Sequence, residues 1–517
     1  MTPKPVLSAA EAIRQFVRSH MTVAIEGFIG LSKVEELLIA LREEYLQNRQ
    51  PEKLTIVHCA GQGNGTSPGC GMNRLAVEGL IGKLIAGHFA MAPDIQRLIL
   101  ENKIAAYNLP QGVIAHLYRD IAAGKPGTIT SVGLGTFVDP EQDGGRLNLK
   151  AWEAGSVVER VQLMGSDYLL YKAFPIDVAF IRATTADRFG NCSMEKEAVT
   201  LEATAMAQAA KNSSGRVLVQ VERIVDEPLD PKSIKIPGIY VDALILSRPE
   251  NHWMTNETEY NSGYSGEKRL PISAMAPLPL TERKVIARRA ARELTPGAIT
   301  NLGIGMPEGI GAVAAEEGLG DLVLTTESGT IGGYPASGGD FGAALNPDCI
   351  LSQPEQFDFY DGGGLDLAFL GLAQVDRNGN LNVSRFGSKI AGCGGFINIT
   401  QNAKKVVFCG TLTAGGLKTR VGNGRLEILQ EGKTRKFVDL VEQITFSGSY
   451  ALKRRQPVLY ITERAVFRLT DEGLELTELA PGVDLRRDVL DQIAFPVCTQ
   501  NVQPMDETLF LEYTASP

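Results

Sequence analysis

The sequence lacks the features that mark membrane, secreted and nucleic-acid-binding proteins. It contains no run of about 18 apolar residues, so we expect no transmembrane helix. The first residues, Met1 to Pro5, lack the apolar core of a signal peptide. There is no long Lys/Arg run and the net charge is −9, whereas binding to a phosphate backbone requires a basic surface. These absences predict a cytoplasmic protein without membrane or nucleic-acid partners.

Cysteine and histidine are both scarce. The seven cysteines form no CxxC pair and no zinc-site spacing, and their odd number fits a reducing cytoplasm. The five histidines are scattered, so no Ser–His–Asp arrangement or metal cluster can be proposed, and His58 in a strand is interpreted as a core residue. No GxxxxGK[ST] phosphate loop occurs. We therefore predict no metal site and no permanently bound cofactor.

Glycine is abundant, at 55 of 517 residues, and it clusters after strand-like segments. The pattern begins with an expected helix at Ala9–Ser19, a strand at Met21–Ile25, a helix at Lys33–Asn48 and a strand at Leu54–Cys59. Alternation of strand, Gly-rich turn and helix predicts an α/β fold with a mainly parallel sheet flanked by helices. Its functional loops are expected at the carboxyl ends of the strands.

The chain also repeats itself at an offset of 189 residues. Residues 177–191 match residues 366–380 at seven identical positions, and each copy is expected to form a hairpin that begins with a strand. Segment 216–221 aligns with 405–410 at the same offset. We infer two duplicated open α/β domains at 1–250 and 281–517, joined by a linker at 251–280. Thr281 is the expected N-cap of the first helix after the linker.

Glu327 is the clearest candidate for chemistry. It stands between an expected strand ending at Thr326 and a Gly-rich turn, where a carboxylate projects from the edge of a sheet. The structural alternative is that Glu327 caps the following turn or helix.

Three further segments have both a structural and a functional interpretation. Gly303 and Gly305 precede an expected helix and could bind an anion or form a simple turn. Segment 386–396 contains Gly392, Gly394 and Gly395, and it is either a bulge before a strand at Phe396–Ile399 or a cradle of N–H groups for developing negative charge. Gln111 places an amide at a turn that opens a helix, which as a local feature is mostly structural.

Taken together, these segments resemble the family I coenzyme A (CoA) transferases, specifically the long single-chain type that acts on acetate and other short-chain acids. The resemblance covers nearly the whole chain. Its motifs are Tyr107–Gly112, Gly133–Pro140, Gly303–Gly305, Thr326–Gly329 with Ile331–Gly333, Phe357–Asp366, Gly392–Asn398, Phe408–Ala414 and Ile461–Phe467.

The resemblance implies a role for each candidate residue. Glu327 corresponds to the family's nucleophile, Gly394 and Gly395 to its oxyanion-stabilising turn, and Gln111 to its active-site amide. Gly303, Gly305 and Gly392 are then expected to bind CoA, which is a substrate and not a resident cofactor. One departure is the turn at Glu26–Ser32, where the family usually has a Gly-rich turn ending in Gly-x-Pro.

The implied reaction transfers CoA between short-chain acyl-CoA and free carboxylic acids, by a ping-pong mechanism through a glutamyl-CoA thioester. The two halves then correspond to the fused α and β subunits of split relatives, and a homo-oligomer, dimer or tetramer, is expected. Two alternatives stay open: an acyl-CoA hydrolase on the same scaffold, and a non-catalytic sensor that binds CoA or another metabolite.

Overall fold

The computed structural model describes residues 2–271, 278–319 and 322–512. Its chain divides into two compact units, each built from segments that lie far apart in the sequence. Unit 1 comprises Met1–Pro271, Thr326–Phe359 and Ser388–Asn398, and unit 2 comprises Ile272–Thr325, Tyr360–Gly387 and Ile399–Pro517. Part of the predicted linker, residues 272–277, lies outside the described residues. The division into domains at 250 and 281 therefore stays a prediction.

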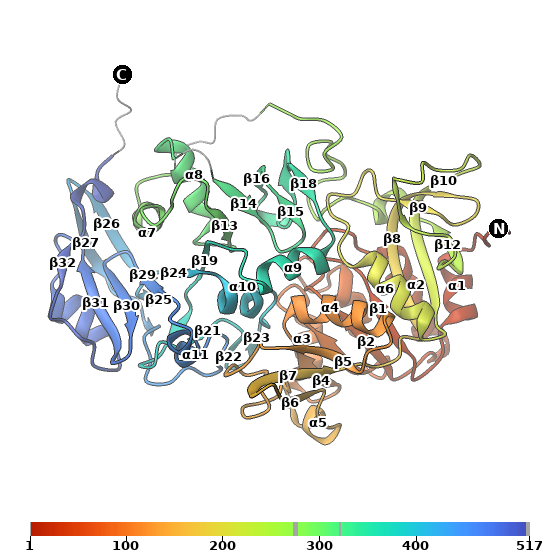
Figure 1. The fold of residues 1–517 in the computed structure, drawn as a ribbon, viewed down its shortest axis with the longest axis horizontal. Helices are drawn as coiled ribbons and strands as arrows, with labels where there is room; N and C mark the ends of the chain where they lie inside the picture. The colour runs from red at the N-terminus through yellow and green to blue at the C-terminus, as the bar shows by residue number, and fades with distance from the viewer. Residues whose placement is uncertain (1, 272–277, 320–321, 513–517) are drawn as a thin grey trace. The chain divides into compact units, whose positions relative to one another are not determined.

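A nine-stranded sheet forms the centre of unit 1 (Figure 1). Its parallel strands follow the order β12 (Ala243–Leu246), β10 (Arg216–Val225), β8 (Val178–Asp187), β1 (Thr22–Ile25), β2 (Leu54–His58), β3 (Ile81–Ala86) and β4 (Ala105–Asn108). Next to β8, the antiparallel strands β9 (Cys192–Ser193) and β11 (Ile234–Ile236) complete it. Because parallel strands end at one edge of a sheet, residues that follow β1, β2, β3 and β4 gather at that edge.

Helices cover both faces of this sheet. One face carries α1 (Ala9–Phe16), α2 (Glu35–Asn48) and α3 (Pro93–Leu100), and the other carries α4 (Gln111–Ala122) and α6 (Ala203–Asn212). A capping box fixes the start of α1, because Ser8 accepts from the Glu11 N–H and the Glu11 carboxylate accepts from the Ser8 N–H. The helices expected at 9–19 and 33–48 are thus confirmed, with shorter ends.

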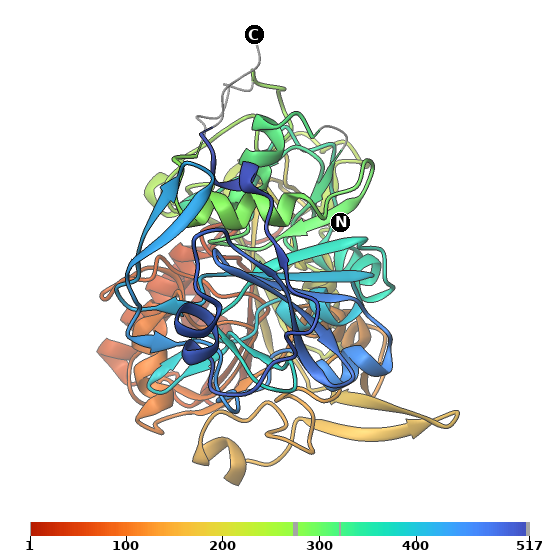
Figure 2. The same ribbon diagram turned by 90° about the vertical axis from the view of Figure 1, so that its left-hand side faces the viewer.

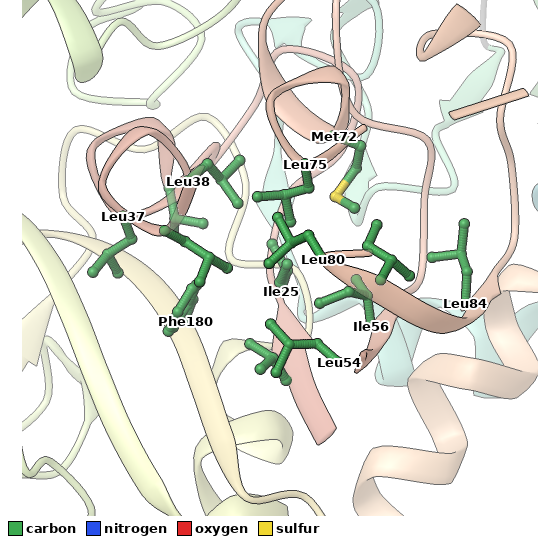
Figure 3. Packing of buried hydrophobic residues seen from close by; sticks show 14 of the residues in the cluster. Ile25, Leu37, Leu38, Leu54, Ile56, Met72, Leu75, Leu80, Leu84 and Phe180 are labelled. Carbon is green, nitrogen blue, oxygen red and sulfur yellow. The ribbon is translucent and has the colours of Figure 1, made fainter. Parts of the chain in front are cut away.

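The main core of unit 1 lies between the sheet and the α1–α3 face (Figure 3). Leu54 and Ile56 are two residues apart on β2, so both point to this face and belong to the same buried cluster as Leu37 and Leu38 of α2. Each of these side chains is fully buried. Burial of one such side chain stabilises the fold by about 1.5–3 kcal/mol.

A smaller antiparallel sheet in unit 1 contains β5 (Gly127–Thr130), β7 (Ser166–Lys172) and β6 (Val158–Leu163), in that order. The β6–β7 hairpin, gold in Figure 2, extends outward as a narrow ribbon. Its tip carries Leu163 and the fully exposed Met164. Nearby elements expose further apolar side chains, Ile129 on β5 and Leu149 and Trp152 on α5 (Leu149–Glu153).

The remaining strands of unit 1 are short. They are β15 (Thr330–Ile331) paired with β18 (Cys349–Ile350), β16 (Tyr334–Pro335) paired with β17 (Ala344–Leu345), and β23 (Lys389–Ile390). Two helices run from unit 1 into unit 2 along the chain, α9 (Gln353–Asp361) and α10 (Phe396–Asn402).

Unit 2 contains its own open sheet. The strand order is β14 (Val323–Thr325), β13 (Ile299–Leu302), β19 (Leu367–Gly371), β24 (Lys405–Cys409), β29 (Val458–Ile461), β30 (Ala465–Thr470), β31 (Gly473–Leu479) and β32 (Gln503–Pro504). The first five are parallel. The helices are α7 (Glu282–Ala291), α8 (Glu308–Glu316) and α11 (Gly448–Lys453). Further strands of unit 2 lie outside this sheet: β20 (Gln374–Val375), β21 (Leu381–Asn382), β22 (Arg385–Phe386), β25 (Thr413–Ala414), β26 (Lys418–Gly422), β27 (Arg425–Gln430) and β28 (Thr434–Arg435).

The internal repeat is a true structural duplication. β8 pairs with β10 in the same register as β19 pairs with β24. Arg216 lies opposite Val178, and the residues 189 positions later, Lys405 and Leu367, also lie opposite each other. The loop contacts repeat as well. Asp187 accepts from the N–H of residue 191 and from its side-chain amide, and Asp376 accepts from the same two groups of residue 380. The predicted fold class, two duplicated α/β halves with mainly parallel sheets, is confirmed.

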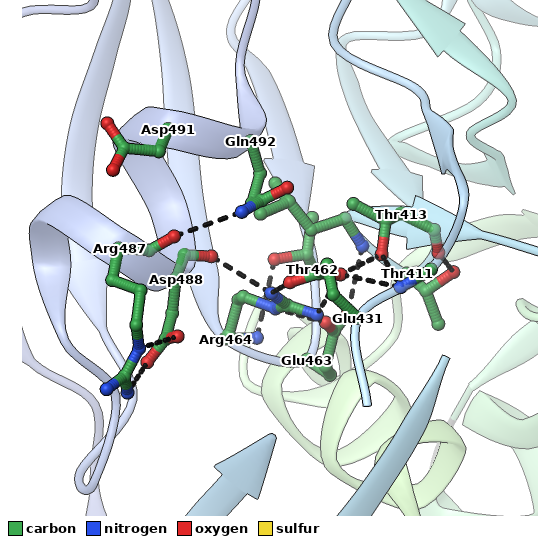
Figure 4. Close-up of polar contacts among 12 residues, drawn as sticks. Thr411, Thr413, Glu431, Thr462, Glu463, Arg464, Arg487, Asp488, Asp491 and Gln492 are labelled. Atoms are coloured by element: carbon green, nitrogen blue, oxygen red, sulfur yellow. Dashed lines mark hydrogen bonds and ion pairs between the residues drawn. The ribbon is translucent and has the colours of Figure 1, made fainter. Parts of the chain in front are cut away.

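A buried arginine stabilises unit 2 (Figure 4). Arg464 is completely buried and donates to the carboxylates of Glu463 at 2.6 Å and Glu431 at 2.7 Å. It also donates to the Asp488 carbonyl at 2.9 Å. Glu463 is equally buried and accepts from the Leu412 N–H at 2.9 Å. The Ile461–Phe467 motif therefore carries an internal ion pair.

The structure corrects two local predictions. The expected strand at Phe396–Ile399 is wrong, because Phe396 begins helix α10. Phe396, Ile397 and Ile399 have high β propensity, but Ile397, Asn398 and Ile399 are all buried, so burial on all sides outweighs the local β propensity. Thr281 does precede α7, yet its side chain makes no capping hydrogen bond.

Candidate active site

Glu327 lies in a short turn that its neighbours hold in place. The turn follows β14, and the Thr326 N–H donates to the Thr330 carbonyl at 3.0 Å. The Thr326 hydroxyl lies 2.7 Å from the hydroxyl of the fully buried Ser328. Gln353 donates from its side-chain amide to the Glu327 carbonyl at 3.4 Å. The backbone beneath the carboxylate is therefore fixed.

The Glu327 carboxylate has a raised pKa and one backbone donor. Burial raises its pKa to about 7, and a hydrogen bond from the Gly395 N–H acts in the opposite direction. The donor comes from another segment of unit 1, so the carboxylate reaches away from its own turn. An ionised carboxylate that is poorly solvated is a better nucleophile than one in water.

The Gly394–Gly395 turn is attached to the ends of β3 and β4. The Gly394 N–H donates to the Gly87 carbonyl at 2.7 Å, and the Gln111 N–H donates to the Gly394 carbonyl at 2.9 Å. Gly394 has a φ of 52°, in the left-handed region. A Cβ at position 395 would lie 1.9 Å from Glu327 Oε2. Only glycine allows the backbone at 395 to approach the carboxylate this closely.

Gln111 opens α4 at the same place. Its side chain is buried, and its Nε2 has no hydrogen-bond partner among the described residues. Its Oε1 lies 3.8 Å from the position of a Cβ on Gly394. Because an unpartnered buried donor costs about 1–3 kcal/mol, the amide is suited to a ligand oxygen. The prediction that Gln111 lies at a turn opening a helix is confirmed.

His88 is a site residue that sequence reasoning missed. It directly follows the Gly87 that holds Gly394, and its Cδ2 lies 3.8 Å from the position of a Cβ on Gly394. Burial lowers its pKa to about 4. As one of five scattered histidines it gave no motif. Its position after β3, matching that of Gln111 after β4, is the signal that could have found it.

The Glu26–Ser32 turn packs beside the segment that carries Glu327. Phe28 stacks on Phe341 with ring centroids 6.0 Å apart. Glu26 is fully buried and accepts from the Arg182 N–H at 2.8 Å. Burial raises the pKa of Glu26 and raises that of nearby Glu202 to about 7. This turn therefore brings a buried acid with a raised pKa and an aromatic ring to the same sheet edge.

The predicted CoA-binding glycines differ in their surroundings. Gly303 donates its N–H to the Phe369 carbonyl at 2.8 Å, while Gly305, with a φ of 83°, is exposed and has open space where a Cβ would point. Both belong to unit 2, just before α8. Gly392 belongs to unit 1, and a Cβ there would lie 2.8 Å from the Gly87 carbonyl. Gly392 thus has a structural reason to be glycine.

Within the described ranges 2–271, 278–319 and 322–512, no group of three or more His, Cys, Asp or Glu side chains could hold a metal ion. Over the same residues, the helices are all too short or too polar to cross a membrane. His58 is a buried strand residue that contacts the Ala60 carbonyl through Nδ1 at 2.6 Å, in agreement with its interpretation as a core residue.

The chain is similar to CoA transferases over nearly its full length. Residues 6–247 match the family model described as coenzyme A transferase. The chain is 44% identical to the acetate CoA-transferase YdiF of Escherichia coli O157:H7, with 98% of this chain and 95% of that protein covered. It is 43% identical to the caffeate CoA-transferase of Acetobacterium woodii, with 98% and 97% covered.

A solved structure agrees with the sequence matches. The acyl-CoA transferase YdiF of E. coli O157:H7, described as a thioester complex with CoA, superposes with a TM-score of 0.91 at 43% identity. It covers 98% of this chain and 96% of its own. On these similarities and on the duplicated α/β fold, the chain belongs to the coenzyme A transferase family.

Proposed function

We propose that this CoA transferase exchanges CoA between short-chain acyl-CoA and free carboxylic acids through a covalent thioester on Glu327. The observation that carries the proposal is the pairing of the Glu327 carboxylate with the Gly395 N–H in a site where burial raises the carboxyl pKa to about 7. The thioester complex with CoA described for the E. coli relative supports it.

The reaction begins with attack of Glu327 on the acyl-CoA carbonyl. A carboxylate oxygen forms a bond to that carbon, the C–S bond breaks, and the products are a mixed anhydride and the CoA thiolate. The thiolate then attacks the Glu327 carbonyl and releases the acid, which leaves a glutamyl-CoA thioester. An incoming acid reverses both steps. One thioester replaces another, so the exchange requires no ATP.

Two donors are available for the negative charge of each tetrahedral intermediate. The Gly395 N–H already contacts the Glu327 carboxylate. The Gln111 amide, next to Gly394, has its donor unpartnered among the described residues. Loss of one such donor typically lowers the rate by about 10²–10³-fold. We assign stabilisation of the oxyanion to this pair.

We assign the CoA nucleotide to the turn before α8 in unit 2. Gly305 is exposed there with open space beside it, and the start of a helix favours phosphate groups. Gly303 supports the turn through its bond to β19. Gly392 contributes by holding its own segment against Gly87. CoA is a substrate here, and we propose no permanently bound cofactor.

We propose acetate and similar short acids as substrates, since the relative named an acetate CoA-transferase is 44% identical. We also propose a homo-oligomer, a dimer or a tetramer. The exposed apolar side chains around the β6–β7 hairpin, including Met164 and Trp152, supply a surface that a second copy could cover. All seven cysteines are free thiols, which supports a reducing cytoplasm.

The deciding experiment measures intact mass after the protein is mixed with acetyl-CoA, compared with Glu327→Gln. The proposal expects a CoA-sized adduct that maps to Glu327 and is absent from the variant. Acetate release without an acceptor acid, and without accumulation of the adduct, would indicate a hydrolase. Tight CoA binding with neither adduct nor turnover would indicate a sensor.

A further inference from the structure

Neither ring nitrogen of His88 makes a hydrogen bond to a described residue, although the ring lies beside the Gly394–Gly395 turn. Its Nδ1 is buried without a partner. The residue as a whole is only partly buried. A histidine beside this turn with both nitrogens uncommitted has hydrogen-bonding capacity that the fold does not use.

The orientation of the ring follows from its neighbours. Nδ1 faces the Gly61 turn, where it lies 2.6 Å from the position of a Cβ. Cδ2 faces Gly394. Since Nε2 is bonded to Cδ2, the second nitrogen lies on the side of the Gly394–Gly395 turn. The Phe89 N–H donates to the Ala391 carbonyl at 2.7 Å, which fixes the two segments together.

The ring is also uncharged. Burial, with a contribution from His58, lowers the pKa of His88 to about 4. His58 itself is neutral, because burial lowers its pKa to about 4 as well. A cationic imidazole would form an ion pair with a carboxylate and weaken it as a nucleophile. A neutral ring can orient a carboxylate and leave the charge on its attacking oxygen.

We propose that His88 binds the incoming acid, and that its Nε2–H donates to the carboxylate oxygen that does not attack. The inference rests on the proposed function, because the acceptor is a carboxylic acid that attacks a thioester on Glu327. The other oxygen forms a bond to the Glu327 carbonyl carbon and the C–S bond breaks, which gives the anhydride and the CoA thiolate. The proton on Nε2 stays on His88 throughout.

The test uses a preformed enzyme–CoA thioester and two nucleophiles. Acetate needs His88 to hold its carboxylate, whereas hydroxylamine, which carries no carboxylate, does not. For His88→Phe, which keeps a ring without a donor, the rate constant for consumption of the thioester by acetate should fall about 10- to 100-fold. The rate constant with hydroxylamine should stay within about twofold. His88→Asn retains a short donor and should lose less.

The exposed His20, which has a φ of 68°, provides the matched control. His20→Asn removes an imidazole at a left-handed position that Asn tolerates, and it should change neither rate. Equal losses with acetate and hydroxylamine in a folded His88→Asn variant, or no loss in His88→Phe, would overturn the assignment. If the unmodified protein forms no CoA adduct, the proposed function itself fails, and this result is distinguishable from failure of the His88 assignment alone.

Discussion

The backbone N–H of Gly395 donates to the carboxylate of Glu327, and a Cβ at position 395 would lie 1.9 Å from Oε2. Gly395→Ala therefore forces the carboxylate out of position. The backbone at 395 does not adopt the left-handed conformation that favours glycine, so the added methyl group is the only change. We expect kcat for CoA transfer to fall by about 10²–10³-fold, the usual cost of losing one such donor. Steady-state kinetics with a thermal melt of the variant checks this.

Gly311→Ala is the control for that substitution. Gly311 lies within α8, and a Cβ there would make an ordinary contact with Leu302 at 3.6 Å. Alanine in a helix is about 0.5–1 kcal/mol more favourable than glycine. The control should melt slightly higher and keep its activity. A Gly395→Ala variant as active as this control would show that the contact has no part in the reaction.

The raised pKa of Glu327 predicts the pH dependence of the reaction. Burial raises that pKa to about 7, and only the ionised form attacks. The acid limb of kcat/KM should bend near pH 7 and then fall about tenfold per pH unit below it. The histidines near the site have pKa values of about 4, so they do not move this limb. A profile that stays flat down to pH 5 would contradict the assignment.

The same shift predicts a gain in stability when the carboxyl is removed. A folded pKa of about 7 against 4.5 in the unfolded chain means that stability is lost as the pH rises through this range. Glu327→Gln cannot ionise, so at pH 8 it should be more stable than the parent by about 3 kcal/mol. The difference should vanish near pH 4. Urea unfolding at the two pH values measures it, and a variant less stable at pH 8 would refute the argument.

Arg464 predicts a large structural effect in unit 2. Arg464→Met leaves the fully buried Glu463 without its cation, which typically costs about 3–5 kcal/mol. Arg420→Met is the matched control, because the ion pair between Arg420 and Glu427 is exposed and contributes less than about 1 kcal/mol to stability. Thermal unfolding of both variants should therefore separate them clearly. Equal melting temperatures would show that Arg464 contributes no more than a surface pair.

Much of the fold was predictable from local pattern, because the relevant signals are short. The periodicity around Ala9, the strand at Leu54 and the Asp-led loops of the repeat each depend on neighbours in sequence. The Phe396 segment was not predictable, since its helix depends on burial from all sides. The two repeats preserve the same loop contacts at Asp187 and Asp376, which is why an offset in sequence predicted a duplication in space.

For the candidate site as well, local sequence pattern predicted some features and missed those that depend on contacts between distant segments. The position of Glu327 after a strand and the resemblance to a family both indicated it. The orientation of the Gly395 N–H and the unpartnered amide of Gln111 require coordinates, because they depend on three segments that meet in unit 1. His88 carried no motif at all. His88 is recognised as a site residue only by its proximity to the Gly394 turn, which lies about 300 residues further along the chain.

Unit 1 draws its last segment from Ser388–Asn398, long after its first segment ends at Pro271. During synthesis, unit 1 therefore stays incomplete after its first 271 residues until a further 127 have been added. At typical elongation rates of about 5–20 residues per second, this takes about 6–25 s. Until then the nascent chain has Gln111 and His88 but neither Glu327 nor Gly395 in place. Synthesis thus completes unit 1 only after the nucleophile and its donor have been added, and a product that ends before Ser388 can carry no working site.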